Sequence, residues 1–332
     1  HKIDWKVFYR LTPALYWLFV GLTAATYFIG TSTNDAARWI AIGSIQFQPS
    51  EGLKVMTILM LARRMSTRQG NINKIHLLPT SFRITEPQQM RIIRENTWPL
   101  VGPVLLSCGV VVTAHTSSAV LIFIASLIML YIGRVRIREL MKLTAVACVL
   151  GILLMSVLRI GRADVAGGRL STWVKEWTTS EVPRNSYSMS DTQRAMIAIR
   201  EGGLFGEGAG HSTTRALVTH PESDYAYSFF ISEYGLVIAL ILMMLYLWIF
   251  FRSIEIFRAC SVPFPALMTL GLGLLVTCQA LLHIMVQVNL IPETGQNLPL
   301  ISRGGSSLLF TTLTLGMILS VSRTNELGEG RA

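Results

Sequence analysis

Long apolar runs alternate with short polar segments along the chain. Most of the runs approach the length of about 20 residues that an α-helix needs to cross the hydrocarbon core of a bilayer. They cover residues 11–30, 50–62, 98–114, 117–133, 140–159, 225–251, 263–291 and 306–321, and the second is short and polar at its start. The pattern predicts an all-α polytopic membrane protein with about eight transmembrane helices, in one transmembrane domain over residues 1–332.

Composition excludes two other classes of protein. Hydrophobic residues make up 51% of the 332 residues and charged residues 14%, whereas soluble domains carry roughly 25% charged residues. An ordinary soluble enzyme and a disordered chain are therefore excluded. The net charge of +10 is compatible with nucleic-acid binding, but basic residues in a polytopic chain first report orientation, because cytoplasmic loops collect lysine and arginine. We therefore expect no nucleic-acid partner.

The distribution of basic residues predicts the orientation. If the chain starts in the cytoplasm, 18 of its 29 lysines and arginines fall in the tails and loops on that side. The short loops on the opposite side, 31–49 and 292–305, hold one arginine each, Arg38 and Arg303. Both ends of this chain should therefore be cytoplasmic.

Residues 160–224 form one long extracytoplasmic loop in this arrangement. A connection of this length is usually functional or disordered. It contains two amphipathic stretches, 170–177 and 191–200, which we expect to fold against the membrane surface. Its glycine-rich segment, 202–210, has no strand before it and lies on the external side, so a flexible re-entrant turn is favoured over a nucleotide-binding loop.

Two charged residues lie inside the second apolar run. Ionisable groups within a span are costly and are kept where they pair or line a water-filled cavity. Glu51 and Lys54 are three residues apart, which places both on one face of a helix that Pro49 and Ser50 would start. One interpretation is a mutually neutralising ion pair; the other is that both face an external cavity, where Lys54 offers a cation to a phosphate.

The seventh run carries a polar stripe. Gln279, His283 and Gln287 recur every four residues in a segment otherwise rich in Leu, Val, Ile and Met. Such a stripe must face the interior of the helix bundle. Hydrogen bonding between helices, with a neutral histidine, is favoured over catalysis for these residues.

Asp224 opens the sixth run, after a short polar segment. An aspartate at this position commonly caps a helix by accepting hydrogen bonds from backbone N–H groups, and the sequence supports a cap and a catalytic carboxylate equally. Glu233 lies nine residues further on, about half a turn around the helix from Asp224. A close pair of carboxylates, as in a glycosidase, is therefore not expected on this helix.

Three stretches of the chain, taken together, resemble the SEDS family of polytopic cell-wall glycosyltransferases. Their order and spacing match the family across essentially the whole chain. Members of that family have ten spans, with the long external loop between the seventh and the eighth, so this chain is expected to lack the first two. The stretches are Arg38-Trp39-Ile40 with Gln48-Pro49-Ser50-Glu51 and Lys54; Ala198-Ile199 with Gly202-Gly203-Leu204-Phe205-Gly206 and residues 208–224; and Pro292-Glu293-Thr294-Gly295 with Leu298-Pro299, Ile301-Ser302 and Gly304-Gly305-Ser306-Ser307.

The resemblance implies roles for individual residues. Asp224 would be the catalytic residue, and Arg38, Glu51 and Lys54 would line its cavity. Arg159 and Arg162 match a pair of arginines that opens the long loop in the family. The remaining residues expected to bind substrate are Gln193, His283, Gln287 and Ser306.

The implied reaction is the polymerisation of lipid II during septal cell-wall synthesis. Residues 222–224 and Arg303 depart from the usual family pattern, which favours an FtsW-like member over a RodA-like elongation polymerase. The expected cofactor is a divalent cation, Mg or Mn, with no organic cofactor. The expected partners are a class B penicillin-binding protein and other divisome membrane proteins, in the bacterial cytoplasmic (inner) membrane. The rival interpretations are a lipid II flippase and a scaffold that only positions a transpeptidase.

Overall fold

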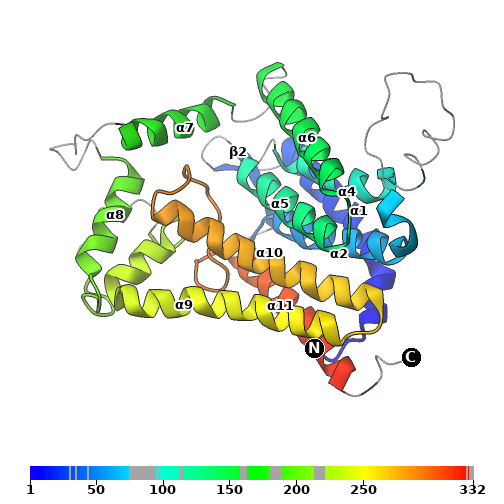
Figure 1. Cartoon of the computed structure of the whole chain (residues 1–332). Coiled ribbons are helices and arrows are strands. Elements are labelled where there is room, and N and C mark those ends of the chain that lie inside the picture. The colour runs from blue at the N-terminus through cyan, green and yellow to red at the C-terminus, as the bar shows by residue number, and fades with distance from the viewer. Residues whose placement is uncertain are drawn as a thin grey trace. The chain divides into compact units, whose positions relative to one another are not determined.

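The computed structural model describes residues 1–29, 31–33, 36–42, 45–74, 95, 97–112, 115–157, 163–178, 189–212, 221–326 and 328. These residues form α-helices and one small antiparallel sheet (Figure 1). Contacts between Cα atoms divide the chain into two compact units. The first unit comprises residues 1–163, 252–275 and 312–332, and the second comprises residues 164–251 and 276–311.

Each of the eight apolar runs coincides with a helix. In the part of the chain that the structure describes, four helices are long and apolar enough to cross a membrane, namely α1, α9, α10 and α11, while α4 and α5 are apolar but shorter. The predicted fold class is therefore confirmed. The bounds are α1 Trp5–Ile29, α2 Pro49–Ser66, α4 Trp98–Val112, α5 Thr116–Ile132, α6 Ile137–Val157, α9 Ala226–Ala259, α10 Pro263–Gln287 and α11 Gly305–Glu326.

Helix α2 is the centre of the first unit and contacts α1, α4 and α5. Fifteen of its 18 residues are buried, although it contains a glutamate and a lysine in its first turns. It approaches α1 closely at Gly52, where an added Cβ atom would overlap with the ring of Phe19. Gly271 gives α10 a similarly close approach to α2 at Ile58 and to α5 at Met129. Close packing therefore surrounds a helix that is only partly apolar.

A chain of hydroxyl groups satisfies the polar side chains around α2. Thr57 donates to the hydroxyl of Ser107 at 2.8 Å, and Ser107 donates to the hydroxyl of Tyr16 at 3.2 Å. Tyr16 in turn donates to the carbonyl of Pro103 at 2.8 Å. Each of these three hydroxyl groups therefore has a hydrogen-bond partner, as buried hydroxyls require. The same bonds join α1, α2 and α4 to one another.

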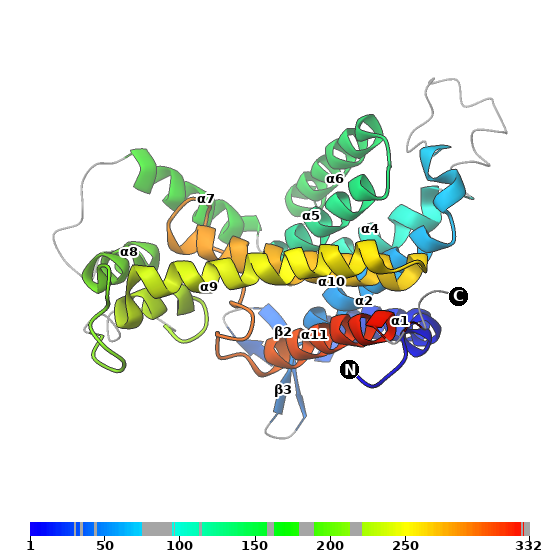
Figure 2. The same cartoon turned by 60° about the horizontal axis from the view of Figure 1, so that its bottom comes forward.

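The connection between α1 and α2 contains a three-stranded antiparallel meander, which the apolar pattern did not predict (Figure 2). Its strands are β1 Thr31–Thr33, β2 Ala36–Ile42 and β3 Ile45–Phe47. The register pairs Ile42 with Ile45, so two residues connect β2 to β3. Pro49 then starts α2, a position that suits proline because the first N–H groups of a helix have no intrahelical acceptor. A short 3-10 helix, Gln69–Lys74, follows α2.

Two helices in the second unit coincide with the amphipathic stretches of the long loop. They are α7, Ala163–Thr178, and α8, Asp191–Gly202. A capping box begins α8: the side chain of Ser190 accepts from the backbone N–H of Gln193, and the side chain of Gln193 accepts from the backbone N–H of Ser190, both at 3.1 Å. Helix α8 lies beside the first turns of α9 (Figures 1 and 2).

Helix α9 is broken at Gly235, whose φ of 83° and ψ of 167° are open only to glycine. The glycine-rich segment after α8 replaces the hydrogen bonds lost at the break. The N–H groups of Leu236 and Val237 donate to the carbonyls of Gly203 and Leu204, and those of Glu207 and Gly208 donate to the carbonyls of Ser232 and Glu233. The re-entrant turn predicted for residues 202–210 is therefore bonded to both halves of α9.

Candidate active site

Asp224 lies at the start of α9 in the second unit and is half-buried. The helix begins at Ala226, and the carbonyl of Tyr225 accepts a hydrogen bond from the N–H of Phe229. Tyr225 therefore occupies the N-cap position, and Asp224 precedes it by one residue. This register separates Asp224 from the usual position of a capping side chain.

Four consecutive residues around Asp224 are each bonded to the end of α10 or to the connection between α10 and α11. The four partners come from different points of that segment, so the backbone around Asp224 is fixed along its length rather than at one end. The bonds run from the N–H of Arg303 to the carbonyl of Glu222 at 2.9 Å, from the hydroxyl of Ser302 to the carbonyl of Ser223 at 2.8 Å, from the amide of Gln287 to the carbonyl of Asp224 at 2.8 Å, and from the hydroxyl of Tyr225 to the carboxylate of Glu293 at 3.0 Å.

Two side-chain features strengthen this arrangement. The guanidinium of Arg303 also pairs with the carboxylate of Glu222 at 2.8 Å. Burial raises the pKa of the Tyr225 hydroxyl, and the neighbouring charge of Glu293 raises it further. Tyr225 therefore remains a hydrogen-bond donor at neutral pH.

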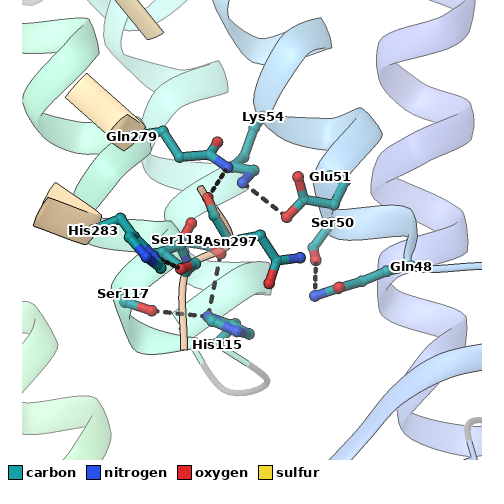
Figure 3. Close-up of polar contacts among 11 residues, drawn as sticks. Gln48, Ser50, Glu51, Lys54, His115, Ser117, Ser118, Gln279, His283 and Asn297 are labelled. Atoms are coloured by element: carbon teal, nitrogen blue, oxygen red, sulfur yellow. Dashed lines mark hydrogen bonds and ion pairs between the residues drawn. The ribbon is translucent and has the colours of Figure 1, made fainter. Parts of the chain in front are cut away.

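The polar stripe of α10 holds backbone carbonyls in place. Gln279 donates to the carbonyl of Asn297 at 2.9 Å, and Nδ1 of His283 lies 2.7 Å from the carbonyl of Gln296 (Figure 3). Since a carbonyl can only accept, Nδ1 of His283 carries the hydrogen, and Nε2 is buried with no partner among the described residues.

Gln287 completes the stripe, because it donates to the carbonyl of Asp224 and accepts from the hydroxyl of Ser228 at 2.6 Å. The three side chains thus bond either the connection between α10 and α11 or the segment that contains Asp224.

Glu51 and Lys54 form an ion pair in the first unit. Nζ of Lys54 lies 2.8 Å from Oε1 of Glu51 (Figure 3). The side chain of Lys54 is 2% exposed and that of Glu51 is 9% exposed. Both residues lie in the first turns of α2, where Gln48 also donates to the hydroxyl of Ser50 at 3.1 Å. The predicted pairing of Glu51 with Lys54 is confirmed. The structure adds that both charged side chains are buried.

A second polar group of the first unit lies at the start of α5. His115 occupies the N-cap position, and its Nδ1 atom lies 2.9 Å from the hydroxyl of Ser117 and 3.2 Å from that of Ser118 (Figure 3). Ser118 is fully buried. These residues were not among the predicted site residues, although a histidine and two serines directly before an apolar run form a helix-start signal.

The other predicted site residues have varied positions. Arg38 lies in β2, and Arg159 and Arg162 fall outside the described residues. Gln193 is engaged in the capping box of α8, and Ser306 is buried in the first turn of α11. Among the residues that the structure describes, no group of three His, Cys, Asp or Glu side chains is arranged to hold a metal ion.

One family of proteins matches the chain almost from end to end. Its model, described as "Cell cycle protein" and named for FtsW, RodA and SpoVE, matches residues 1–327. The chain belongs to this family. The resemblance found in the sequence motifs is thereby confirmed, and together with the apolar helices it makes the chain a multi-pass membrane protein.

Two relatives illustrate the distance within the family. The probable peptidoglycan glycosyltransferase FtsW of Caulobacter vibrioides is 29% identical over 336 residues, which cover 96% of this chain and 76% of that protein. Stage V sporulation protein E of Bacillus subtilis is 27% identical over 296 residues, which cover 89% of this chain and 74% of that protein.

Solved structures share the same fold. RodA of Thermus thermophilus superposes with a TM-score of 0.60 at 22% identity, covering 97% of this chain and 81% of that one. A chain of a peptidoglycan synthase complex, whose structure concerns the coordination of polymerization and crosslinking, gives a TM-score of 0.67 at 21% identity, covering 97% of this chain and 84% of that one.

Proposed function

We propose that this chain is a peptidoglycan glycosyltransferase that polymerises lipid II for septal wall synthesis, with Asp224 as the catalytic base. The observation that carries the proposal is the fixation of the Asp224 segment by four bonds from the end of α10 and the α10–α11 connection. A catalytic carboxylate must be held in a productive geometry by its supporting residues. The name of the Caulobacter relative supports the same activity.

The proposed reaction needs one base. The 4-hydroxyl of one GlcNAc attacks C1 of a MurNAc that is linked through an α bond to undecaprenyl diphosphate. The carboxylate of Asp224 takes the proton of that hydroxyl, the new β-glycosidic bond forms, and the bond from C1 to the diphosphate oxygen breaks with its electron pair leaving on the diphosphate. Because the configuration at C1 inverts in a single displacement, no carboxylate nucleophile is needed. A diphosphate leaves as an anion, so no second carboxylic acid is needed to protonate it.

The leaving diphosphate needs positive charge. We assign this role to Lys54, Arg38, Arg159 and Arg162, because ammonium and guanidinium groups are the side chains that bind anionic oxygens most strongly. Glu51 would orient Lys54, which it contacts at 2.8 Å. A divalent cation would supply further neutralisation of the same charge. Ser306, Gln193, His283 and Gln287 are assigned to the support or binding of the substrate.

We propose that the reaction takes place at the outer surface of the bacterial inner membrane and that both ends of this chain lie in the cytoplasm, because most of its lysines and arginines fall in the tails and loops of one side. Crosslinking of the product requires a second enzyme, and we propose a class B penicillin-binding protein within the divisome. The solved peptidoglycan synthase complex supports this pairing, because it coordinates polymerization and crosslinking and contains a chain of the same fold. Helix α9 offers exposed apolar side chains for a contact within the membrane, among them Leu240, Met244 and Trp248.

Reconstitution with labelled lipid II distinguishes the proposed polymerase from its rivals. The purified chain, with its penicillin-binding partner, is placed in liposomes, and both glycan polymer and transfer of lipid II between leaflets are measured. A polymerase produces long glycan strands. Leaflet transfer without polymer would instead identify a flippase, and the absence of both activities in a folded complex would identify a scaffold.

A further inference from the structure

Two large apolar residues stand next to each other in the glycine-rich segment that follows α8. Phe205 is 84% exposed and Leu204 is 59% exposed. Single exposed apolar residues are ordinary on protein surfaces, whereas adjoining ones that form a patch mark a surface that contacts a membrane or another molecule. We call Leu204 and Phe205 the apolar tip.

Glycines on both sides of the apolar tip lie directly against the backbone of α9. An added Cβ atom at Gly202 would overlap with the carbonyl of Ile231, and one at Gly206 would overlap with the carbonyl of Glu233. The segment therefore packs on α9 through residues that have no side chain. The two residues between these glycines that do carry side chains are Leu204 and Phe205, and both remain exposed.

Backbone hydrogen bonds fix the level of the apolar tip along α9 (Figure 1). The N–H of Leu236 donates to the carbonyl of Gly203 at 3.0 Å, and the N–H of Val237 donates to the carbonyl of Leu204 at 3.3 Å. Leu236 and Val237 directly follow the break at Gly235 and are themselves exposed. The apolar tip and the first residues after the break therefore form one exposed apolar patch.

The length of the apolar part of α9 places this patch at the edge of the bilayer core. Residues 236–251 are all apolar or aromatic, and a charged residue, Arg252, follows them. A helix of that length spans about 24 Å, whereas the hydrocarbon core is about 30 Å thick. Because charged residues are costly inside the core, one boundary lies near Arg252. The other boundary is then reached at about the level of the break and of the apolar tip.

This part of the molecule meets the two conditions for contact with lipid. Only 17% of the most apolar stretch of α9 is buried, so the helix presents most of its surface outward. Irregular backbone is tolerated at membrane depth only when its polar groups are bonded by neighbouring segments. Four backbone hydrogen bonds join the glycine-rich segment to the two sides of the break.

We propose that the apolar tip contacts the hydrocarbon chains of the bilayer at the boundary where α9 breaks. A lipid surface is the partner that fits, because Leu204 and Phe205 carry no charge and adjoin the exposed apolar residues at the start of the long half of α9. The contact holds the end of α8 and the break in α9 at a fixed depth relative to the bilayer. It stands independently of the reaction proposed above.

The depth of the apolar tip is measured by the accessibility of spin labels. The four cysteines of the chain are replaced by alanine, and Leu204→Cys and Phe205→Cys each receive a nitroxide. The full chain is placed in liposomes of phosphatidylethanolamine and phosphatidylglycerol. For each label, collisions with oxygen, which concentrates in hydrocarbon, are compared with collisions with a water-soluble nickel chelate.

Two reference positions calibrate the comparison. Leu319→Cys labels an exposed residue of α11, a helix long and apolar enough to cross a membrane. Ala209→Cys labels an exposed residue of the same glycine-rich segment, next to Gly210, whose N–H donates to the carboxylate of Glu233 at 2.9 Å. We expect the ratio of oxygen to nickel collisions at both tip positions to lie closer to the ratio at residue 319 than to that at residue 209.

The other outcomes overturn the proposal in distinguishable ways. A ratio dominated by nickel collisions at both tip positions, as at residue 209, would place the apolar tip in water. Low rates with both reagents would mean that protein covers it. The measurement is repeated with the class B penicillin-binding protein bound, and loss of both collision rates on binding would assign the apolar tip to that partner instead.

A second measurement keeps the native cysteines and so remains decisive if their replacement prevents folding. The photoreactive residue p-benzoylphenylalanine is incorporated in place of Phe205, and in place of Leu319 as the reference, and the chain is irradiated in the same liposomes. We expect mass spectrometry to find a phospholipid attached at both positions. A lipid adduct at residue 319 without one at residue 205 would overturn the proposal.

Discussion

The side-chain amide of Gln287 donates a hydrogen bond of 2.8 Å to the backbone carbonyl of Asp224. The other end of the same amide accepts from Ser228 at 2.6 Å, so Gln287 is fixed on both sides and is fully buried. The last turn of α10 thus determines where the first residues of the α9 segment lie. Gln287 is a positioning residue in this account, because it acts on Asp224 through the backbone.

Gln287→Glu should therefore lower kcat more than it changes KM. A glutamate can still accept from Ser228, but when ionised it cannot donate to the Asp224 carbonyl. A displacement of about 1 Å at a catalytic group can cost roughly 100-fold in rate, and we expect a loss between about 10-fold and 100-fold. Steady-state kinetics with lipid II measure both parameters.

The matched control is Gln279→Glu, which makes the same change on the same face of α10 but acts on the carbonyl of Asn297. A loss of kcat equal to that of Gln287→Glu would contradict the positioning role.

A second prediction concerns stability and follows from the break in α9. Gly235→Ala should strongly destabilise the protein, since an alanine there is strained and its methyl group would overlap with the carbonyl of Leu204. The backbone strain alone costs roughly 1–3 kcal/mol. Gly210→Ala is the control, because Gly210 has a φ of 77° but no atom within 4 Å of an added Cβ.

The two variants should therefore separate strain from overlap. Thermal unfolding in detergent should give a larger fall of the apparent Tm for Gly235→Ala than for Gly210→Ala. Equal falls would mean that the glycine-rich segment is not packed against the break as described.

A third prediction follows from the buried ion pair of α2, Glu51 with Lys54. Lys54→Met leaves the carboxylate of Glu51 buried without its partner, a change that typically costs about 3–5 kcal/mol. The double variant Glu51→Gln with Lys54→Met removes both charges and should recover most of that stability. If the pair serves substrate binding, the double variant is folded yet inactive in the polymerisation assay. A double variant with full activity would show that the pair has a structural role only.

Two variants of Gln193 test whether this residue has a structural role or binds substrate. In the capping box its side chain accepts from the N–H of Ser190, a role that glutamate performs equally well. Gln193→Ala should lower stability by about 0.5–2 kcal/mol, and Gln193→Glu should be neutral in thermal unfolding. Activity then decides: a stable Gln193→Glu variant with a raised KM for lipid II supports substrate binding, and normal kinetics restrict Gln193 to the cap.

Local patterns predicted most of the elements. The apolar runs predicted the helices, and the amphipathic stretches 170–177 and 191–200 predicted α7 and α8, because periodicity is a property of the sequence itself. The β meander was missed, although Gly43-Ser44 between two short apolar runs is a hairpin signal. The apolar pattern assigned residues 31–49 to a short loop between two spans, and so it predicted no strands there.

The contacts of the candidate site could not be predicted in the same way. The bond from Gln287 to the Asp224 carbonyl joins residues 63 positions apart, and nothing in the local sequence of either one specifies the other. The pairing of residues 203–208 with the break at Gly235 is also non-local, and an isolated glycine within an apolar run was its only signal.

If Asp224 is the catalytic base, the variant Asp224→Asn should be folded but inactive. Asparagine has nearly the same size and shape as aspartate and can accept the same hydrogen bonds through its Oδ1 atom, whereas it cannot take the proton of the attacking hydroxyl. Loss of a general base typically costs roughly 100-fold to 10,000-fold in rate. The measurement is glycan polymerisation from labelled lipid II by the purified variant, alongside its thermal unfolding and partner binding. We predict normal unfolding and partner binding with almost no polymer, and polymerisation at a rate near that of the unaltered chain would contradict the account.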